Sequence, residues 1–180
     1  AMGQGALQYN TTGYQNSAMG VSTLNANTTG SNNSATGYQA LYSNTTGNSN
    51  SAVGTYALNA NTTGSYNSAM GLQALTNNTT GNSNSAMGYQ ALVFNTTASN
   101  NTAVGYQAGY SNTTGTYNSY LGYQSGYSNI VGTRNTAVGW SALYTNTGEY
   151  NTGIGHDALY YNTTGNSNTA LGVSALQSNT

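Results

Sequence analysis

Small and apolar residues recur along the chain at a fixed interval. In NSAMGYQAL, residues 84–92, an alanine precedes an apolar residue and a glycine, and a second alanine and a leucine close the segment. Asparagine, threonine and glycine fill the stretch before it, as in NTTGNS at 78–83. Short runs bounded by glycine and asparagine are typical of β-strands between turns. The pattern predicts two strands in each repeat, Asn-Ser-Ala-Met-Gly and Tyr-Gln-Ala-Leu, with a glycine bend between them.

The repeat begins at an asparagine and is seventeen residues long, with a single deletion. The deletion removes one threonine in NTGEYN, residues 146–151, and the pattern continues unchanged after it. Because the chain starts and stops in mid-repeat, we expect one repeat domain over residues 1–180 that is a window of a longer array. The repeats begin at Asn10, Asn27, Asn44, Asn61, Asn78, Asn95, Asn112, Asn129, Asn146 and Asn162.

The length and glycine content of the repeat decide its fold class. A helix–turn–helix repeat needs about twice this length, and glycine inside a helix costs about 1 kcal/mol relative to alanine. The sequence therefore predicts an all-β fold, a β-solenoid or β-roll of about ten coils stacked at about 4.8 Å. Each coil has few apolar side chains to bury. We therefore expect further burial against sister chains, through a lateral contact, or under attached sugar.

Two asparagines occupy the same place in every repeat, the first and the seventh residue counted from the repeat's start. Identical asparagines one strand spacing apart can hydrogen-bond through their side-chain amides and form a ladder along the stack. We predict an inward, structural ladder for the seventh-position column. This column is formed by Asn16, Asn33, Asn50, Asn67, Asn84, Asn101, Asn118, Asn135, Asn151 and Asn168.

The first-position asparagine begins an Asn-X-Ser/Thr sequon in most repeats. A glycan needs an exposed corner, and we expect this column to point outward while the seventh points inward. Asn129 and Asn146 keep the asparagine without the sequon, so plain turn chemistry stays an alternative to glycosylation. Other sequons begin at Asn32, Asn77 and Asn100. The candidate N-glycosylation sites are Asn10, Asn27, Asn44, Asn61, Asn78, Asn95, Asn112 and Asn162.

Charge is almost absent, since charged residues make up 2% of the chain and the formal net charge is −1. Nucleic-acid binding needs clustered lysine and arginine, and the apolar runs are too short to cross a bilayer. We therefore expect neither a nucleic-acid partner nor membrane insertion. Arg134 and Glu149 fall in consecutive repeats, where they are candidates for an exposed ion pair. Such a pair contributes about 0–1 kcal/mol.

Groups that could perform catalysis are few. His156 and Asp157 are neighbours, but adjacent residues on a strand point to opposite faces, so we expect no dyad. Calcium-binding solenoids carry an aspartate in each repeat, whereas this chain has only Asp157. The sequence predicts a protein that is not an enzyme, with no catalytic residue, no metal and no cofactor apart from covalent glycans.

Aromatic and threonine columns suggest other roles. Paired threonines along a rigid rod are compatible with ice binding, and tyrosine stripes could stack on sugars or fill the space between coils. An ice-binding or carbohydrate-binding solenoid is therefore the alternative function. The stripes are predicted at the twelfth position by Tyr89, Tyr106, Tyr123 and Trp140, and at the sixteenth by Tyr110, Tyr127, Tyr144 and Tyr160.

The repeat also resembles a known class of protein. NSAMGYQA (84–91) and NTAVGYQA (101–108) resemble the head repeats of trimeric autotransporter adhesins, although this repeat is longer. NTTGNSNTALGVSAL (162–176) is similar to repeats of bacterial and phage tail-fibre-like proteins. The resemblance implies a structural component of an extracellular fibre or surface adhesin, on a cell or virion surface. It also implies self-association, as a homotrimer or an end-to-end filament.

Overall fold

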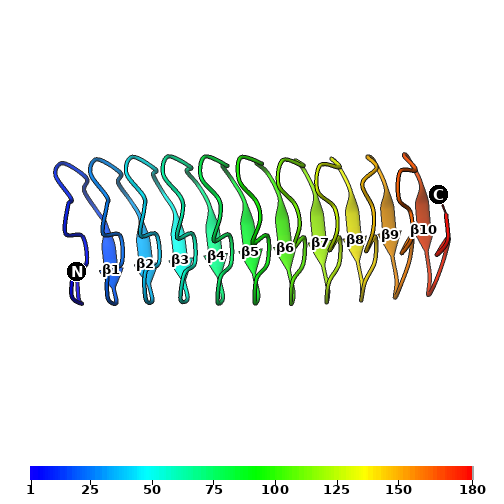
Figure 1. Cartoon of the computed structure of the whole chain (residues 1–180), viewed down its shortest axis with the longest axis horizontal. Coiled ribbons are helices and arrows are strands. Elements are labelled where there is room, and N and C mark those ends of the chain that lie inside the picture. Colours follow the sequence, from blue (N-terminus) through cyan, green and yellow to red (C-terminus); the bar gives the residue numbers. More distant parts are fainter. Residues whose placement is uncertain (180) are drawn as a thin grey trace.

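The computed structural model describes residues 1–179, which form a β-solenoid without helices (Figure 1). Each complete coil contributes one strand of three residues, and the strands form a single ten-stranded parallel sheet in chain order. The predicted all-β stack of seventeen-residue coils is confirmed. The strands are Ser17–Met19 (β1), Ser34–Thr36 (β2), Ser51–Val53 (β3), Ser68–Met70 (β4), Ser85–Met87 (β5), Thr102–Val104 (β6), Ser119–Leu121 (β7), Thr136–Val138 (β8), Thr152–Ile154 (β9) and Thr169–Leu171 (β10).

The strands pair in strict register. Ser68 of β4 pairs with Ser85 of β5, and Ala69 and Met70 pair with the equivalent residues of that strand. Thr136 of β8 pairs with Thr152 of β9, so the register is kept across the one-residue deletion. The missing threonine is absorbed in the corner between these strands. Equivalent side chains therefore form columns along the rod.

The second strand expected in each repeat does not form. Gln90 and Leu92, in the segment after the glycine bend, have φ angles of 54° and 50°, in the left-handed region. Ala91 and Leu92 are both buried, whereas neighbouring residues on a strand point to opposite faces. The left-handed residues turn two consecutive side chains into the interior. A strand could not bury both, because its side chains alternate.

The glycine at the eleventh position is required by the stacking. Gly88 has a φ of 135°, and a Cβ atom there would lie 2.3 Å from the carbonyl oxygen of Gly105 in the next coil. No side chain fits so close to a backbone atom. The same close approach recurs along the rod, which explains why this position is glycine in every repeat.

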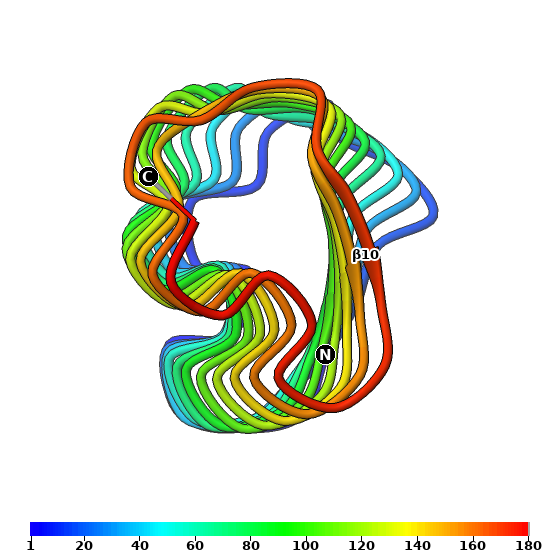
Figure 2. The ribbon, with the colours of Figure 1, turned by 90° about the vertical axis from the view of Figure 1, so that its right-hand side faces the viewer.

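The interior has an apolar side and a polar side. Ala86, from strand β5, packs with Ala91 and Leu92 in a continuous core cluster. Asn78 and Asn84 of the same coil are also buried. Seen end-on, the coils overlie one another with a small rotation from one to the next (Figure 2). Most coils thus bury a few small apolar groups beside two asparagine amides.

Candidate functional site

The seventh-position asparagines form the predicted ladder. The side-chain amide of Asn84 donates to Oδ1 of Asn67 over 3.2 Å and to the carbonyl oxygen of Ala98 over 2.8 Å. The backbone N–H of Asn84 donates to the same Oδ1 over 3.0 Å. Further along, Asn101 keeps the backbone bond to Oδ1 of Asn84. From Asn33 to Asn84, each side-chain amide therefore links three successive coils and fixes their register.

The first-position asparagines also point inward, so the expectation of an outward column was wrong. The side-chain amide of Asn78 donates to Oδ1 of Asn61 over 2.8 Å and to the carbonyl oxygen of Gly81 over 3.0 Å. Both bonds are donated by the side-chain amide nitrogen of Asn78, the atom to which a glycan would be attached. They close the Asn-Thr-Thr-Gly corner over this nitrogen. Asn10, in the first corner, is half-buried. The other candidate glycosylation sites are fully buried: Asn27, Asn44, Asn61, Asn78, Asn95, Asn112 and Asn162.

Two of the other sequons lie at the surface. Asn32 and Asn100 occupy the sixth position and are exposed. Their φ angles of 59° and 62° turn the side chains away from the interior. Asn77 is half-buried, and its side-chain amide donates to the carbonyl oxygen of Val93 over 2.9 Å. Access therefore separates the sequons by their position in the repeat, which the sequons alone do not reveal.

The first-position ladder is interrupted at one point. The side-chain amide of Asn129 donates to the hydroxyl of Tyr120 and to the carbonyl oxygen of Gly132. Asn112 consequently receives no bond from the next coil, and its buried Oδ1 has no hydrogen-bond partner. Burial raises the pKa of the Tyr120 phenol, partly offset by its hydrogen bond with Asn129. Tyr120 is thus the one phenol in the interior among the described residues.

The predicted aromatic stripes are columns of stacked rings. In the sixteenth-position column, the rings of Tyr110 and Tyr127 are 4.9 Å apart and inclined by 2°. Tyr144 and Tyr160 continue this column at similar spacing. Partial burial raises the pKa of Tyr127, and the nearby tyrosines raise it further by a smaller amount. Because neighbouring rings cover one another's faces, the column presents mainly ring edges and hydroxyls to solvent.

The threonines of the corner are engaged with the backbone. Thr79, at the second position, donates its hydroxyl to the carbonyl oxygen of Thr96 over 3.1 Å. Thr62 and Thr45 make the equivalent bond in their coils. These hydroxyls are already committed to the stack, which leaves the third-position threonine as the exposed hydroxyl of the corner. The geometry gives little support to ice binding through paired threonines.

Two outward columns flank the column of eleventh-position glycines. Met70 and Leu72, on either side of Gly71, are 48% and 44% exposed. We call these two columns the apolar stripe. The tenth-position members are Met19, Thr36, Val53, Met70, Met87, Val104, Leu121, Val138, Ile154 and Leu171. The twelfth-position members are Val21, Tyr38, Thr55, Leu72, Tyr89, Tyr106, Tyr123, Trp140, His156 and Val173.

The apolar stripe was missed at the sequence level, where the tenth position was assigned to a strand and only the tyrosines of the twelfth were singled out. The signal was present, since the residues on both sides of the fixed glycine are apolar in most repeats. In the sequence alone, Ala69 and Met70 are adjacent apolar residues, and nothing marks which of them is buried. The strand's alternation puts Ala69 inside and Met70 outside.

Comparison with known protein families, curated proteins and solved structures finds no match to this chain. Any functional conclusion therefore rests on its own residues.

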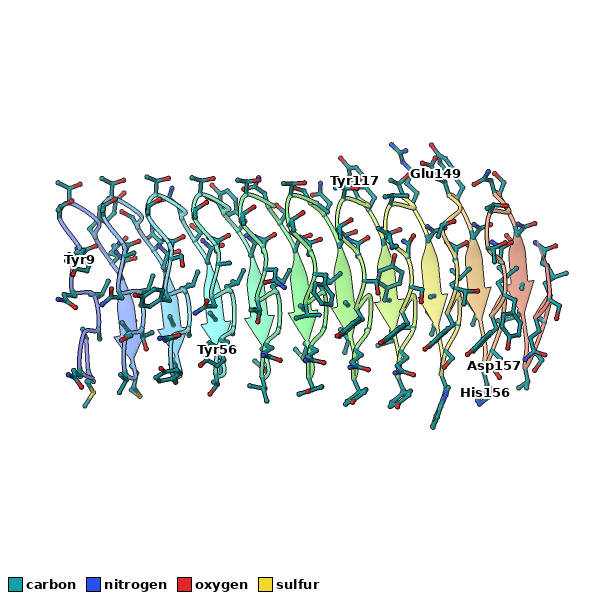
Figure 3. The ribbon with its side chains drawn as sticks, viewed as in Figure 1. Tyr9, Tyr56, Tyr117, Glu149, His156 and Asp157 are labelled. Carbon is teal, nitrogen blue, oxygen red and sulfur yellow. The ribbon has the colours of Figure 1, made fainter. Side chains whose placement is uncertain are left out.

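His156 and Asp157 are in contact, contrary to the expectation that they point to opposite faces. Nδ1 of His156 lies 3.2 Å from a carboxylate oxygen of Asp157. The reason is local: Asp157 has a φ of 56° and lies in the turn after the glycine, where side chains do not alternate. The His156 ring also stacks on Trp140. Figure 3 shows the pair at the edge of the rod, with His156 pointing outward.

Arg134 contacts tyrosines rather than Glu149. Its guanidinium lies 5.4 Å from the centre of the Tyr117 ring and 5.3 Å from that of Tyr150. It also donates to the Tyr150 hydroxyl over 2.9 Å. Tyr117 and Glu149 are seen on the edge of the rod opposite His156 (Figure 3). The cation thus lies between two rings on an exposed corner.

Within residues 1–179, no cluster of three or more histidine or acidic side chains could hold a metal ion. In the same range, no helix is long and apolar enough to cross a membrane. The features that recur along the rod are instead columns: two of asparagine inside, and threonine, aromatic and apolar columns outside, each of the outer ones interrupted in some coils.

Proposed function

We propose that this chain is a structural segment of an extracellular fibre or surface adhesin, carried on a cell or virion surface, and that copies of it self-associate. The observation that carries the proposal is the unbroken register of β1 to β10, which makes a rod of constant cross-section (Figures 1 and 2). A rod of this kind gains length with each repeat and needs no other change in sequence. The resemblance of the repeats to adhesin heads and tail fibres supports the same role.

The test is localisation on native material. Antibodies raised against residues 1–180 are applied, with gold labelling, to intact and to opened cells or virions of the source. The proposal expects label on surface projections of intact particles. Label that appears only after the particles are opened would contradict it.

A second candidate, carbohydrate binding, is favoured by the sixteenth-position column. Tyr110, Tyr127, Tyr144 and Tyr160 present a row of phenol edges and hydroxyls, which can hydrogen-bond a neutral sugar chain that lies along the rod. A glycan array compares the natural chain with Tyr127→Thr, because threonine stands at this position in Thr76. Binding that the substitution weakens supports this candidate, and no binding to any glycan contradicts it.

A further inference from the structure

The apolar stripe is an exposed surface that runs along the described coils of the solenoid. Most coils present one apolar side chain on each side of the glycine, such as Met19 with Val21 and Leu121 with Tyr123. Thr36, Thr55 and His156 interrupt the stripe, the first two in consecutive coils. Soluble monomers rarely expose an apolar surface this continuous, and such patches mark interaction sites.

The exposed apolar side chains of the stripe are large compared with those in the interior. In the coil that contains β5, the buried apolar side chains are Ala86, Ala91, Leu92 and Val93, two of them only a methyl group. Met87 and Tyr89 of the same coil are 50% and 38% exposed. A large part of the coil's apolar surface is therefore still in water. Covering it would add to the stabilisation that the coil gains from its own core.

The axial repeat of the stripe favours a partner surface with the same repeat. Its side chains repeat once per coil, at about 4.8 Å, and a surface with another period could match them at only a few points. A second copy of this chain has the same period by construction. Charge repulsion does not oppose contact between copies, because within residues 1–179 His156 and Asp157 are the only acidic or basic side chains at the stripe.

The size of the stripe is also sufficient. Ten coils give a length of about 50 Å, and two side-chain columns give a width of about 14 Å. The product is about 700 Å² for each copy, close to the roughly 800 Å² per partner of a standard stable interface. A contact between two such stripes is therefore large enough to hold two rods together.

We propose that the apolar stripe is the surface through which two copies of this chain pack side by side, with their long axes aligned. The inference rests on the proposed function, in which copies self-associate, and it names the face that they use. Tenth-position side chains of one copy fill the spaces between those of the other. The ladders and the corner threonines stay outside this contact.

The test compares two matched double substitutions in the same coils. Val53→Glu with Met87→Glu places two charges on the stripe, in coils that do not touch. Thr46→Glu with Thr80→Glu places the same charges on exposed third-position threonines, which lie away from the stripe. Light scattering after size exclusion measures the mass at about 100 μM, and circular dichroism checks that each variant is folded.

We expect the natural chain and the threonine variant to show a multiple of the 18.5 kDa chain mass, and the stripe variant to fall to 18.5 kDa. If the stripe variant unfolds, Met70→Thr with Met87→Thr is used, since Thr36 already occupies this position in another coil. A natural chain that associates equally with and without the stripe substitutions overturns the inference and leaves the fibre proposal standing. A natural chain that stays at 18.5 kDa overturns self-association itself, and both fail.

Discussion

The ring of Tyr120 lies directly over Gly126 and fills the space that a leucine occupies in the other coils, apart from the coil of Gly109. A Cβ atom added at Gly126 would lie 2.2 Å from Cε1 of Tyr120, and one at Gly109, in the preceding coil, would lie 2.6 Å from Cδ2. The ninth position is alanine in most coils, and here it is a buried tyrosine. One large side chain thus replaces an alanine while two leucines are lost. The three positions form a single packing unit.

This packing unit predicts strong coupling between its substitutions. Tyr120→Ala leaves a cavity bordered by two glycines, and we expect it to lower the free energy of unfolding by about 3–5 kcal/mol. Adding Gly109→Leu and Gly126→Leu restores the core of the other coils and should recover most of that loss. Urea unfolding of the single and triple variants measures both values. Equal instability of the two variants would show that the leucine-for-tyrosine exchange is not what fills this space.

The raised pKa of Tyr120 predicts a loss of stability at alkaline pH. The unfolded phenol titrates near pH 10, whereas burial raises the pKa of the folded one. Above about pH 10 the unfolded chain releases a proton that the folded chain holds, so stability falls as pH rises. Unfolding measured from pH 9 to 12 should show a shallower fall for Tyr120→Phe than for the natural chain. Identical slopes would rule out this phenol as a source of the pH dependence.

The seventh-position ladder predicts that its asparagines contribute more to the free energy of unfolding than exposed asparagines do. Asn67→Ser removes bonds to Asn50, Asn84 and the carbonyl oxygen of Gly81. We expect a cost of about 1–3 kcal/mol for each buried group that is left without a partner. The matched control is Asn32→Ser, because Asn32 is exposed and serine occupies its position in other coils. Thermal unfolding should separate the two variants clearly, and equal melting temperatures would contradict the ladder's role.

Burial of the first-position amides predicts which sequons can carry sugar in folded protein. After secretion from a host that glycosylates asparagine, we expect glycans at Asn32 and Asn100, and none at Asn78. Peptide mapping by mass spectrometry decides this, with Asn32→Ser and Asn100→Ser together as the control that should remove the sugar. A glycan on Asn78 in folded material would contradict the closed corner.

The period, the glycines and the uniform asparagine columns were enough to predict the solenoid, because stacking repeats each local requirement in every coil. The direction of individual columns was harder. Whether Asn78 faces in or out depends on how its corner closes, and the sequon pointed to the wrong answer. Leu92 in the left-handed region follows no local preference of leucine. It is imposed by burying Ala91 and Leu92 together, which only the complete coil requires.

Some of the candidate surfaces could be predicted from the sequence and others could not. The tyrosine columns could be predicted, because identical rings in register must stack, and Tyr127 lies between Tyr110 and Tyr144. The contact of His156 with Asp157 could not be, since it needs the backbone of the turn. The apolar stripe required the knowledge that Ala86, and not Met87, faces the interior from this strand.

Fibre diffraction from aligned rods tests the central claim most directly, because it measures the axial repeat of the coils. The stacked solenoid predicts a strong reflection on the meridian, along the rod axis, at about 4.8 Å, from parallel strands that run across that axis. A pattern without that reflection, or with the 4.8 Å spacing perpendicular to the rod, would contradict the stack and the fibre built on it.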